Sequence, residues 1–344
     1  MKKVKWGVIG CGGIADRRTI PGMLLAENAE LVIVMDTNAE LAAKVGEKCK
    51  VGFTVDMDEV LKADIDAVYI ATPVFCHKEQ AEKAMRAGKH VLIEKPVGMT
   101  AAEAKELREI AREVNVKLGV GMMMRFHTHH QNIKKIIADG KIGDIVSMRA
   151  QFSCWYPEIA GSWRQVKKLG GGGALMDLGV HCLDLLQYVT GTKAVGVTAI
   201  CDTQTFTYEV DDSASLLLKM DNGAHAYVDV NFNIPDNAAV SRMEIYGTKG
   251  SVICDGTLAQ EEVGTTKVAF TELTGYDAMQ NRGSDNFLYM EPASGNMYTK
   301  EVESFSASLL DGTEPIAKVD DAIFVQEIAE AAYKSTETDS YIRL

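Results

Sequence analysis

A strand that runs directly into a glycine turn is the feature that most constrains this chain. Apolar Val4–Ile9 is followed at once by Gly10-Cys-Gly-Gly-Ile-Ala15, which has the spacing G-x-G-x-x-A. In such a turn the first glycine permits the tight bend, the second lets a pyrophosphate approach the backbone, and the small Ala15 lets the next helix pack on the strand. That helix then points its N-terminus at the phosphates. The pattern predicts a dinucleotide site that includes Gly10, Gly12, Gly13 and Ile14.

An acidic residue, Asp36, closes the second apolar run, Leu31–Met35. A carboxylate at this point can accept hydrogen bonds from the adenosine ribose hydroxyls, and its charge repels a 2′-phosphate. The residue therefore predicts NAD in preference to NADP. The alternative interpretation of Asp36 is a helix N-cap or an acidic loop residue.

The first third of the chain alternates short apolar runs with longer segments that carry apolar residues at three- and four-residue spacing. Near-continuous apolar runs are typical of parallel strands, because helices cover both faces of such a sheet. We therefore expect an α/β domain with a doubly wound parallel sheet, the Rossmann arrangement. The expected strands are Val4–Ile9, Leu31–Met35, Ala67–Ala71, His90–Glu94 and Lys117–Gly121, and the expected helices are Ala39–Cys49, Lys78–Ala87 and Ala101–Val114.

After about residue 124 the pattern changes, and from roughly Val195 to Phe270 strands follow one another without intervening helices. Ser213–Met220 and Ala224–Asn231 predict a hairpin across Asp221-Asn-Gly223, and Gly247–Gly250 predicts a second turn. This order predicts an α+β domain with a mostly antiparallel sheet, so we divide the chain into a dinucleotide domain, residues 1–123, and a substrate domain, residues 124–344. Helical spacing in the second part occurs at Asn132–Asp139, Met176–Val189, Tyr298–Leu310 and Asp321–Tyr333.

The composition limits the partners and the compartment. The 344 residues include 36 Lys or Arg and 48 Asp or Glu, a net charge of −12, whereas binding to nucleic acid needs a basic face. No apolar run reaches the length of a membrane span, and Lys5 and the glycines after it interrupt a signal-peptide pattern. Seven widely spaced cysteines without a C-x-x-C motif favour a reducing compartment. We expect a cytoplasmic protein without a nucleic-acid or membrane partner.

Polar residues follow two further expected strands, where ligands of doubly wound sheets bind. Thr72 and Pro73 close the strand Ala67–Ala71, and Glu94-Lys95-Pro96 closes the strand His90–Glu94. We expect Thr72, Pro73, His77, Glu94 and Lys95 to lie at the cofactor. The alternatives are a structural His77 at the start of a helix and a solvated lysine at position 95.

Asp177, His181 and Asp184 lie at positions i, i+4 and i+7 of an expected helix and so share one stripe. Leu178, Cys182, Leu185 and Val189 form an apolar stripe beside it. A histidine held next to a carboxylate can act as a proton acceptor near neutral pH. The alternative interpretation is an acid at a helix N-terminus with a partly buried, hydrogen-bonded histidine.

An aromatic and basic group precedes that helix. Aromatic faces can pack on the C–H face of a sugar ring, and arginine can bind hydroxyls or a carboxylate. The candidates for substrate binding are Trp155, Tyr156, Trp163 and Arg164, with Arg125 after the apolar Met122–Met124 as a further one, although core packing of at least one tryptophan is the alternative. His127-Thr-His129-His130 lacks the partners of a zinc motif, so we expect a polar helix entry near the rim of the active site and no metal.

Gly10–Ala15, Glu94-Lys95-Pro96 and Gly171-Gly-Gly-Ala-Leu-Met-Asp177-Leu-Gly-Val-His181 occur in the order and spacing of the Gfo/Idh/MocA oxidoreductases, which the whole chain resembles. The family includes glucose–fructose oxidoreductase and inositol dehydrogenase. The resemblance implies that Lys95 matches the active-site lysine, and that Asp177 and His181 match the catalytic acid and histidine. It also implies that the sheet of the C-terminal α+β domain is large and open, and that this sheet makes the contacts of a homodimer or homotetramer. Val74, and the methionines before Arg125, replace side chains that are often polar in the family.

These observations predict an NAD-dependent oxidoreductase that transfers a hydride between nicotinamide and a secondary alcohol of a sugar, glycoside or cyclitol. His181 takes the hydroxyl proton, Lys95 binds the reacting oxygen, and Asp177 orients His181 or a substrate hydroxyl. One alternative is a redox-neutral glycosidase or lyase that acts through a transient keto-sugar on tightly held NAD. Another is an NAD-binding sensor without chemistry, against which the presence of both Lys95 and His181 argues.

Overall fold

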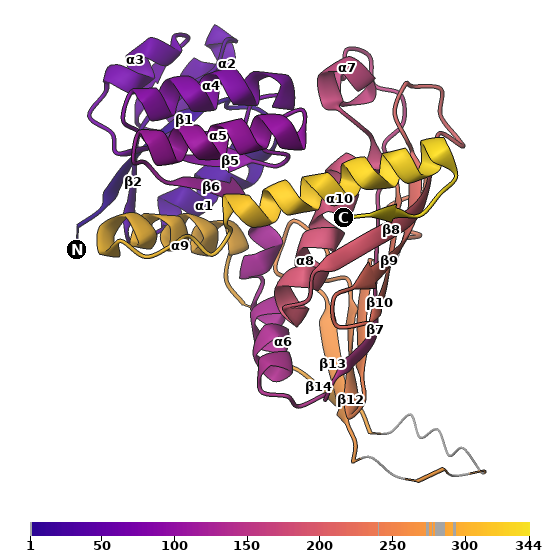
Figure 1. The fold of residues 1–344 in the computed structure, drawn as a ribbon. Coiled ribbons are helices and arrows are strands. Elements are labelled where there is room, and N and C mark those ends of the chain that lie inside the picture. The colour runs from indigo at the N-terminus through magenta and orange to yellow at the C-terminus, as the bar shows by residue number, and fades with distance from the viewer. Residues whose placement is uncertain (1, 240, 273–274, 277, 279–285, 292–293) are drawn as a thin grey trace. The chain divides into compact units, whose positions relative to one another are not determined.

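The chain forms two compact units whose segments alternate along the sequence (Figure 1). The computed structural model describes residues 2–239, 241–272, 275–276, 278, 286–291 and 294–344. Unit 1 comprises Met1–Phe126, Lys168–Gly171 and Asn296–Gln326, and unit 2 comprises His127–Lys167, Gly172–Gly295 and Glu327–Leu344. The division into domains at residue 123 stays a prediction; the first break between the units follows Phe126.

Unit 1 contains a parallel sheet with the strand order β3-β2-β1-β4-β5-β6, which is the Rossmann order. The expected fold class is therefore confirmed for this part of the chain. The strands are β1 (Val4–Ile9), β2 (Ala29–Met35), β3 (Gly52–Thr54), β4 (Ala67–Ile70), β5 (His90–Glu94) and β6 (Leu118–Gly121). The short edge strand β3 is absent from the sequence prediction, since two of its three residues are exposed and it lacks an apolar run.

The helices of unit 1 follow the predicted ranges with shifted ends. The helix expected at Lys78–Ala87 begins four residues earlier, at Val74, directly after Pro73. The glycine turn leads first into a π-helical turn, η1 (Ala15–Thr19), and only then into α1 (Ile20–Leu25). The others are α2 (Ala39–Cys49), α3 (Met57–Lys62), α4 (Val74–Arg86), α5 (Ala101–Glu113) and the 3₁₀ turn η2 (Met123–Phe126).

A helix from far along the chain, α9 (Met297–Asp311), completes the core of unit 1 and lies beside α1 (Figure 1). The ring of Phe305 packs 5.6 Å from that of Trp6, whose indole N–H donates to Ser306 Oγ over 3.1 Å. A Cβ at Gly119 would lie 2.5 Å from the Phe305 ring, so the glycine leaves room for it. Burial of one such phenylalanine contributes about 1.5–3 kcal/mol to stability.

Unit 2 contains a nine-stranded sheet in its described residues, with the order β14-β13-β12-β11-β7-β10-β9-β8-β15. Among the strand pairs that the structure describes in this sheet, only β7–β10 is parallel, so the expected mostly antiparallel sheet is confirmed. The predicted hairpin joins β9 to β10, and the predicted turn at Gly247–Gly250 joins β11 to β12. The strands are β7 (Ile145–Ser153), β8 (Ala194–Asp202), β9 (Ser213–Met220), β10 (His225–Asn231), β11 (Arg242–Gly247), β12 (Gly250–Asp255), β13 (Thr265–Phe270), β14 (Leu288–Tyr289) and β15 (Ile342–Arg343).

Helices of unit 2 lie along one face of this sheet (Figure 1). They are α6 (Thr128–Ala138), the π-helical turn η4 (Leu175–Gly179) and α8 (Val180–Thr190). The short 3₁₀ helix η3 (Trp163–Gln165) also belongs to unit 2. Two helices have residues in both units, α7 (Lys167–Gly170) and α10 (Val319–Thr338). Strand β9 alternates buried and exposed residues, as expected when helices cover one face. Among the described helices, we find none that is long and apolar enough to span a lipid bilayer.

Helix α9 also buries an acid, Glu301, which is 1% exposed. Neither carboxyl oxygen has a hydrogen bond of good geometry to a described residue. Burial raises the pKa of this carboxyl well above its usual range, the nearby Glu94 raises it further, and the Met122 backbone N–H opposes the shift. Glu301 therefore carries a proton in the folded chain at pH values where the unfolded chain has lost it.

Substitution of Glu301→Gln should raise stability above about pH 5 and leave it unchanged near pH 4. The raised folded-state pKa means that the native state binds the extra proton, so the wild-type loses stability as the pH rises above the unfolded pKa. Glutamine carries no such linkage. Urea midpoints of both proteins from pH 4 to pH 8 measure the difference, which should grow with pH. Glu303→Gln, at a partly exposed position of α9, is the matched control, and an equal offset at every pH for Glu301→Gln would contradict the assignment.

Candidate active site

The glycine turn after β1 has the backbone shape that its sequence predicts. Gly10 has φ +92°, and a Cβ there would lie 2.9 Å from the carbonyl carbon of Ala71. Gly13 has φ +48°, which also favours glycine. At Gly12 a Cβ would meet only Leu41 Cδ2, at 4.0 Å, so this side of the turn is open to a ligand. Ala15 is fully buried and Ile14 precedes η1. The turn therefore fits a pyrophosphate that approaches the backbone at Gly12 and Gly13.

Asp36 follows β2 and ties this turn to the end of the strand. Its Oδ2 accepts the Cys11 N–H over 2.9 Å, and its Oδ1 accepts the Asn38 N–H over 2.9 Å. Each carboxylate oxygen has a further lone pair for a ribose hydroxyl. Burial and the nearby Asp36 charge raise the pKa of the Cys11 thiol to about 12, so this cysteine is an inert packing residue.

The residues after β4 and β5 are joined by His77 in the first turn of α4. Its Nδ1 lies 2.9 Å from the Pro96 carbonyl oxygen, and its Nε2 lies 2.9 Å from that of Thr72. The Thr72 hydroxyl donates to Gln80 Oε1 over 2.5 Å. His77 therefore holds the backbone at Thr72, after β4, and at Pro96, the residue that follows Lys95. The peptide bond between Lys95 and Pro96 is cis. A cofactor contact by the buried His77 side chain stays a prediction.

Sequence reasoning missed the partner of Glu94. The hydroxyl of Tyr69 on β4 donates to Glu94 Oε1 over 2.5 Å and lies 2.9 Å from Thr19 Oγ1. Tyr69 is fully buried, and burial raises the pKa of its phenol well above its usual range. A tyrosine inside an otherwise apolar parallel strand was the available signal, because its hydroxyl requires a buried partner.

In unit 2 the structure corrects the expected stripe of Asp177, His181 and Asp184. Residues 175–179 form the π-helical turn η4, so the step from Asp177 to His181 departs from regular α-helical spacing. Helix α8 is buried around most of its circumference, with His181 5% and Asp184 3% exposed. The buried residues of α8 are therefore not limited to the expected apolar stripe of Leu178, Cys182, Leu185 and Val189. Asp177 keeps about one third of its side chain exposed.

Arg164 lies close to Asp177 and to an aromatic ring. Its Nε is 3.9 Å from Asp177 Oδ1, and its guanidinium lies 4.4 Å from the Trp163 ring centroid. Of the expected substrate-binding residues, the structure thus brings Trp163, Arg164 and Asp177 together within unit 2. An arginine in this position can make a cation–π contact with the ring and an ion pair with the carboxylate at the same time.

Trp155 and Tyr156 make other contacts. Trp155 is 43% exposed and meets the Phe206 ring edge-on at 5.2 Å. The Tyr156 ring packs 4.9 Å from Phe232, and its hydroxyl lies 2.8 Å from Ser162 Oγ. Their role toward a substrate stays a prediction.

Arg125 is held inside unit 1. It is 3% exposed, and its Nη1 donates to the Ile316 carbonyl over 2.8 Å and to Asp321 Oδ2 over 3.0 Å. These contacts supply a structural reason for a buried arginine, because a buried charge needs a partner. Substrate binding by Arg125 stays a prediction.

The histidine cluster is a helix entry, as expected, but a buried one. His127 precedes α6 and its Nδ1 accepts the His129 N–H over 3.1 Å. His127, His129 and His130 are each at most 1% exposed, so they do not form a polar rim. Burial lowers the pKa of His129, which favours the neutral ring. The histidines are buried instead of lying at a polar rim because α6 packs against α8, and Ile133 on the same helix is fully buried.

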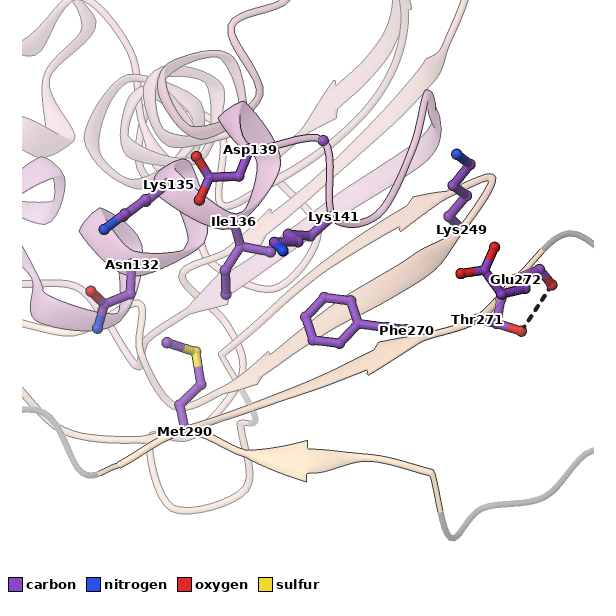
Figure 2. A pocket seen from close by; sticks show the side chains of 11 residues that line it. Asn132, Lys135, Ile136, Asp139, Lys141, Lys249, Phe270, Thr271, Glu272 and Met290 are labelled. Atoms are coloured by element: carbon purple, nitrogen blue, oxygen red, sulfur yellow. Dashed lines mark hydrogen bonds between the residues drawn. The ribbon is translucent and has the colours of Figure 1, made fainter.

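A cavity of about 780 Å³ lies elsewhere in unit 2, between the end of α6 and the end of β13 (Figure 2). Lys135 and Lys141 stand on one side of it, with Phe270 and Met290 opposite (Figure 2). None of the expected site residues lines it.

Comparison with known proteins agrees with both units. Residues 4–122 match the model of the oxidoreductase family with an NAD-binding Rossmann fold, and residues 130–253 match the GFO/IDH/MocA C-terminal domain. A 1,5-anhydro-D-fructose reductase of Ensifer adhaerens is 30% identical over 97% of this chain and 96% of its own length. The chain belongs to the Gfo/Idh/MocA family. The resemblance drawn from the three motifs is thereby confirmed.

Further relatives agree on the class of chemistry. An inositol 2-dehydrogenase of Rhizobium meliloti is 28% identical, with 96% of each chain covered. The solved structure of a levoglucosan dehydrogenase in complex with NADH and levoglucosan is 25% identical, covers 99% of each chain and superposes with a TM-score of 0.87. The protein is an NAD(P)-dependent oxidoreductase of a family that acts on sugars and cyclitols, which confirms the predicted enzyme class.

Proposed function

We propose that this protein is an NAD-dependent dehydrogenase that oxidises a secondary alcohol of a sugar, glycoside or cyclitol, or reduces the corresponding ketone. The observation that carries the proposal is the presence of Lys95 and His181 in a chain whose glycine turn has the open shape that a pyrophosphate needs. Bound NAD supplies the hydride acceptor. The levoglucosan complex supports a small carbohydrate as the substrate class.

The chain's own residues then handle the proton and the charge. His181 accepts the hydroxyl proton of the alcohol as general base, and returns it in the reverse direction. The Lys95 ammonium donates a hydrogen bond to the reacting oxygen and stabilises the negative charge that develops on it. Asp177 orients His181 or binds a neighbouring hydroxyl. Arg164 and Trp163 beside Asp177 support contacts to further hydroxyls and to a ring face.

Replacement of Lys95 or His181 by alanine should lower kcat by about 10²-fold or more, because each removes a group that acts on the proton or the charge of the transition state. The dissociation constant of NAD, measured by fluorescence titration, should stay within about threefold.

Lys44→Ala on α2 and His225→Ala on β10 replace exposed residues of the same types and serve as controls with wild-type turnover. Wild-type kcat in both the Lys95 and the His181 variants would remove this assignment.

We infer that NAD is preferred over NADP because of Asp36. Its carboxylate lies at the open glycine turn and keeps lone pairs for the ribose hydroxyls, whereas a 2′-phosphate there would meet its negative charge.

Substitution of Asp36→Asn removes the charge but keeps one acceptor oxygen for the turn. We expect the ratio of kcat/KM for NAD to that for NADP to fall by about tenfold or more, the effect of losing a charge-assisted hydrogen bond and a repulsion. Initial rates with both cofactors measure it. Asp64→Asn, at an exposed acid of unit 1 that pairs with Lys5, is the charge-matched control. An unchanged ratio for Asp36→Asn would overturn the cofactor assignment.

We further propose a homodimer or homotetramer that forms through the open face of the nine-stranded sheet. Three apolar side chains on neighbouring strands are exposed there, Ile200 at 64%, Leu217 at 46% and Tyr227 at 44%. Leu217 pairs directly with Tyr227 across β9 and β10. Exposed apolar residues grouped on one face are typical of an interface between subunits.

Leu217→Asp should reduce the mass measured by light scattering after gel filtration to that of one chain, because it places a charge in an apolar interface. Leu25→Asp, at an exposed leucine of unit 1, should leave the mass of the oligomer unchanged. A Leu217→Asp protein with the wild-type mass would contradict the interface.

A further inference from the structure

One buried carboxylate, Asp211, holds the start of the helical segment that carries Asp177 and His181. Asp211 lies two residues before the start of β9, with Asp212 between them, and it is 7% exposed. Its Oδ1 accepts the Gly173 N–H over 2.8 Å, and its Oδ2 accepts the Leu175 N–H over 2.8 Å. Its backbone carbonyl accepts the Ala174 N–H over 2.9 Å. Three consecutive N–H groups at the start of this segment therefore donate to one residue.

These contacts replace bonds that a helix cannot make for itself. The first four N–H groups of a helix lack partners within it, and a side-chain acceptor there determines where the helix begins. The first backbone bond of the segment follows at once, from the Asp177 N–H to the Gly173 carbonyl over 3.0 Å. Asp211 thus defines the start and the rotation of η4, the turn on which Asp177 lies and from which α8 continues to His181.

A tyrosine of α10 completes this arrangement. The Tyr333 hydroxyl donates to Asp211 Oδ1 over 2.7 Å. A Cβ at Gly172 would lie 2.1 Å from that hydroxyl, and a Cβ at Gly173 would lie 1.8 Å from the Asp211 carbonyl oxygen. The third and fourth glycines of the run at 170–173 are therefore required for Asp211 and Tyr333 to reach the backbone.

The neighbouring carboxylate, Asp212, binds a different segment of the backbone. It is fully buried and accepts the N–H groups of Gln204, Thr205 and Phe206 over 2.8–3.0 Å. Its contacts hold the loop between β8 and β9 and do not include the glycine run. Asp212 is thus a matched control, since it is a buried acid one residue away with a similar number of backbone bonds.

We propose that Asp211, together with Tyr333, is a positioning residue for the reaction, which acts by fixing the orientation of Asp177 and His181. This inference rests on the proposed function of those two residues. Neither Asp211 nor Tyr333 needs to touch the substrate. Displacement of a catalytic group by about 1 Å can cost about 10²-fold in rate, so a loosened turn should be visible in turnover even when the chain stays folded.

The test compares Asp211→Asn, Tyr333→Phe and Asp212→Asn. Asparagine retains one carbonyl oxygen and cannot accept the Gly173 and Leu175 N–H groups through two carboxylate oxygens. We expect Asp211→Asn to lower kcat by about 10-fold to 100-fold, to alter the pH dependence of kcat, and to leave the NAD dissociation constant unchanged. Tyr333→Phe removes one hydrogen bond and should give a smaller change of the same kind. Asp212→Asn should keep the wild-type kcat and pH profile.

A second measurement separates positioning from general destabilisation. In a background that carries both Asp177→Ala and His181→Ala, Asp211→Asn should have little further effect on kcat, because both residues through which it acts are gone. Full additivity of Asp211→Asn in that background, or a wild-type kcat and pH profile in folded Asp211→Asn, would overturn the proposal. If Asp211→Asn does not fold, a wild-type kcat and pH profile in Tyr333→Phe overturns it instead. Wild-type turnover in His181→Ala would refute the proposed function itself, which is a distinct result.

Discussion

In each unit a carboxylate binds backbone N–H groups of a glycine-rich turn, and the positions of the candidate site residues around the two turns depend on that interaction. In unit 1, Asp36 accepts the Cys11 N–H in the turn after β1. In unit 2, Asp211 accepts the Gly173 and Leu175 N–H groups before α8. At Gly173, glycine is what admits this approach, because a Cβ there would lie 1.8 Å from the Asp211 carbonyl oxygen. Each turn then directs a helical segment, one at the expected dinucleotide and one carrying Asp177 and His181.

Local patterns in the sequence predicted most of the elements, and long-range packing accounts for what they missed. The strands β1, β5 and β9 and the helix α2 begin and end as predicted, because apolar runs and three- and four-residue spacing report burial on a covered face. The place of α9 in the core of unit 1 was not predictable, since its contact with Trp6 joins residues about 300 positions apart. The π-helical turn η4 was missed because a periodicity argument assumes a regular helix.

The same distinction applies to the site. Motif spacing predicted the glycine turn, Asp36 and the residues after β4 and β5. All of them lie in unit 1, where Asp36 accepts a bond from the turn and His77 contacts the residue Thr72 after β4. It also predicted Arg164 and Asp177 as site residues, which lie 3.9 Å apart. Asp211, Tyr333 and Tyr69 belong to no motif. For Tyr69 the signal was a tyrosine in an apolar strand, whereas the importance of Asp211 and Tyr333 is visible only from the hydrogen bonds that they make. The net charge of −12 describes the whole chain and says little about the roles proposed for Lys95 and His181.

The transfer of a labelled hydride tests the central claim most directly. A sugar or cyclitol that gives NADH absorbance in a substrate panel is prepared with deuterium on the carbon to be oxidised, and the reduced nicotinamide is analysed by mass spectrometry and proton NMR. The account predicts one deuterium per NADH, at C4 of the nicotinamide and on one face only, with one ketone formed for each NADH. Product that forms without net NADH, or NADH that contains no deuterium, would contradict it.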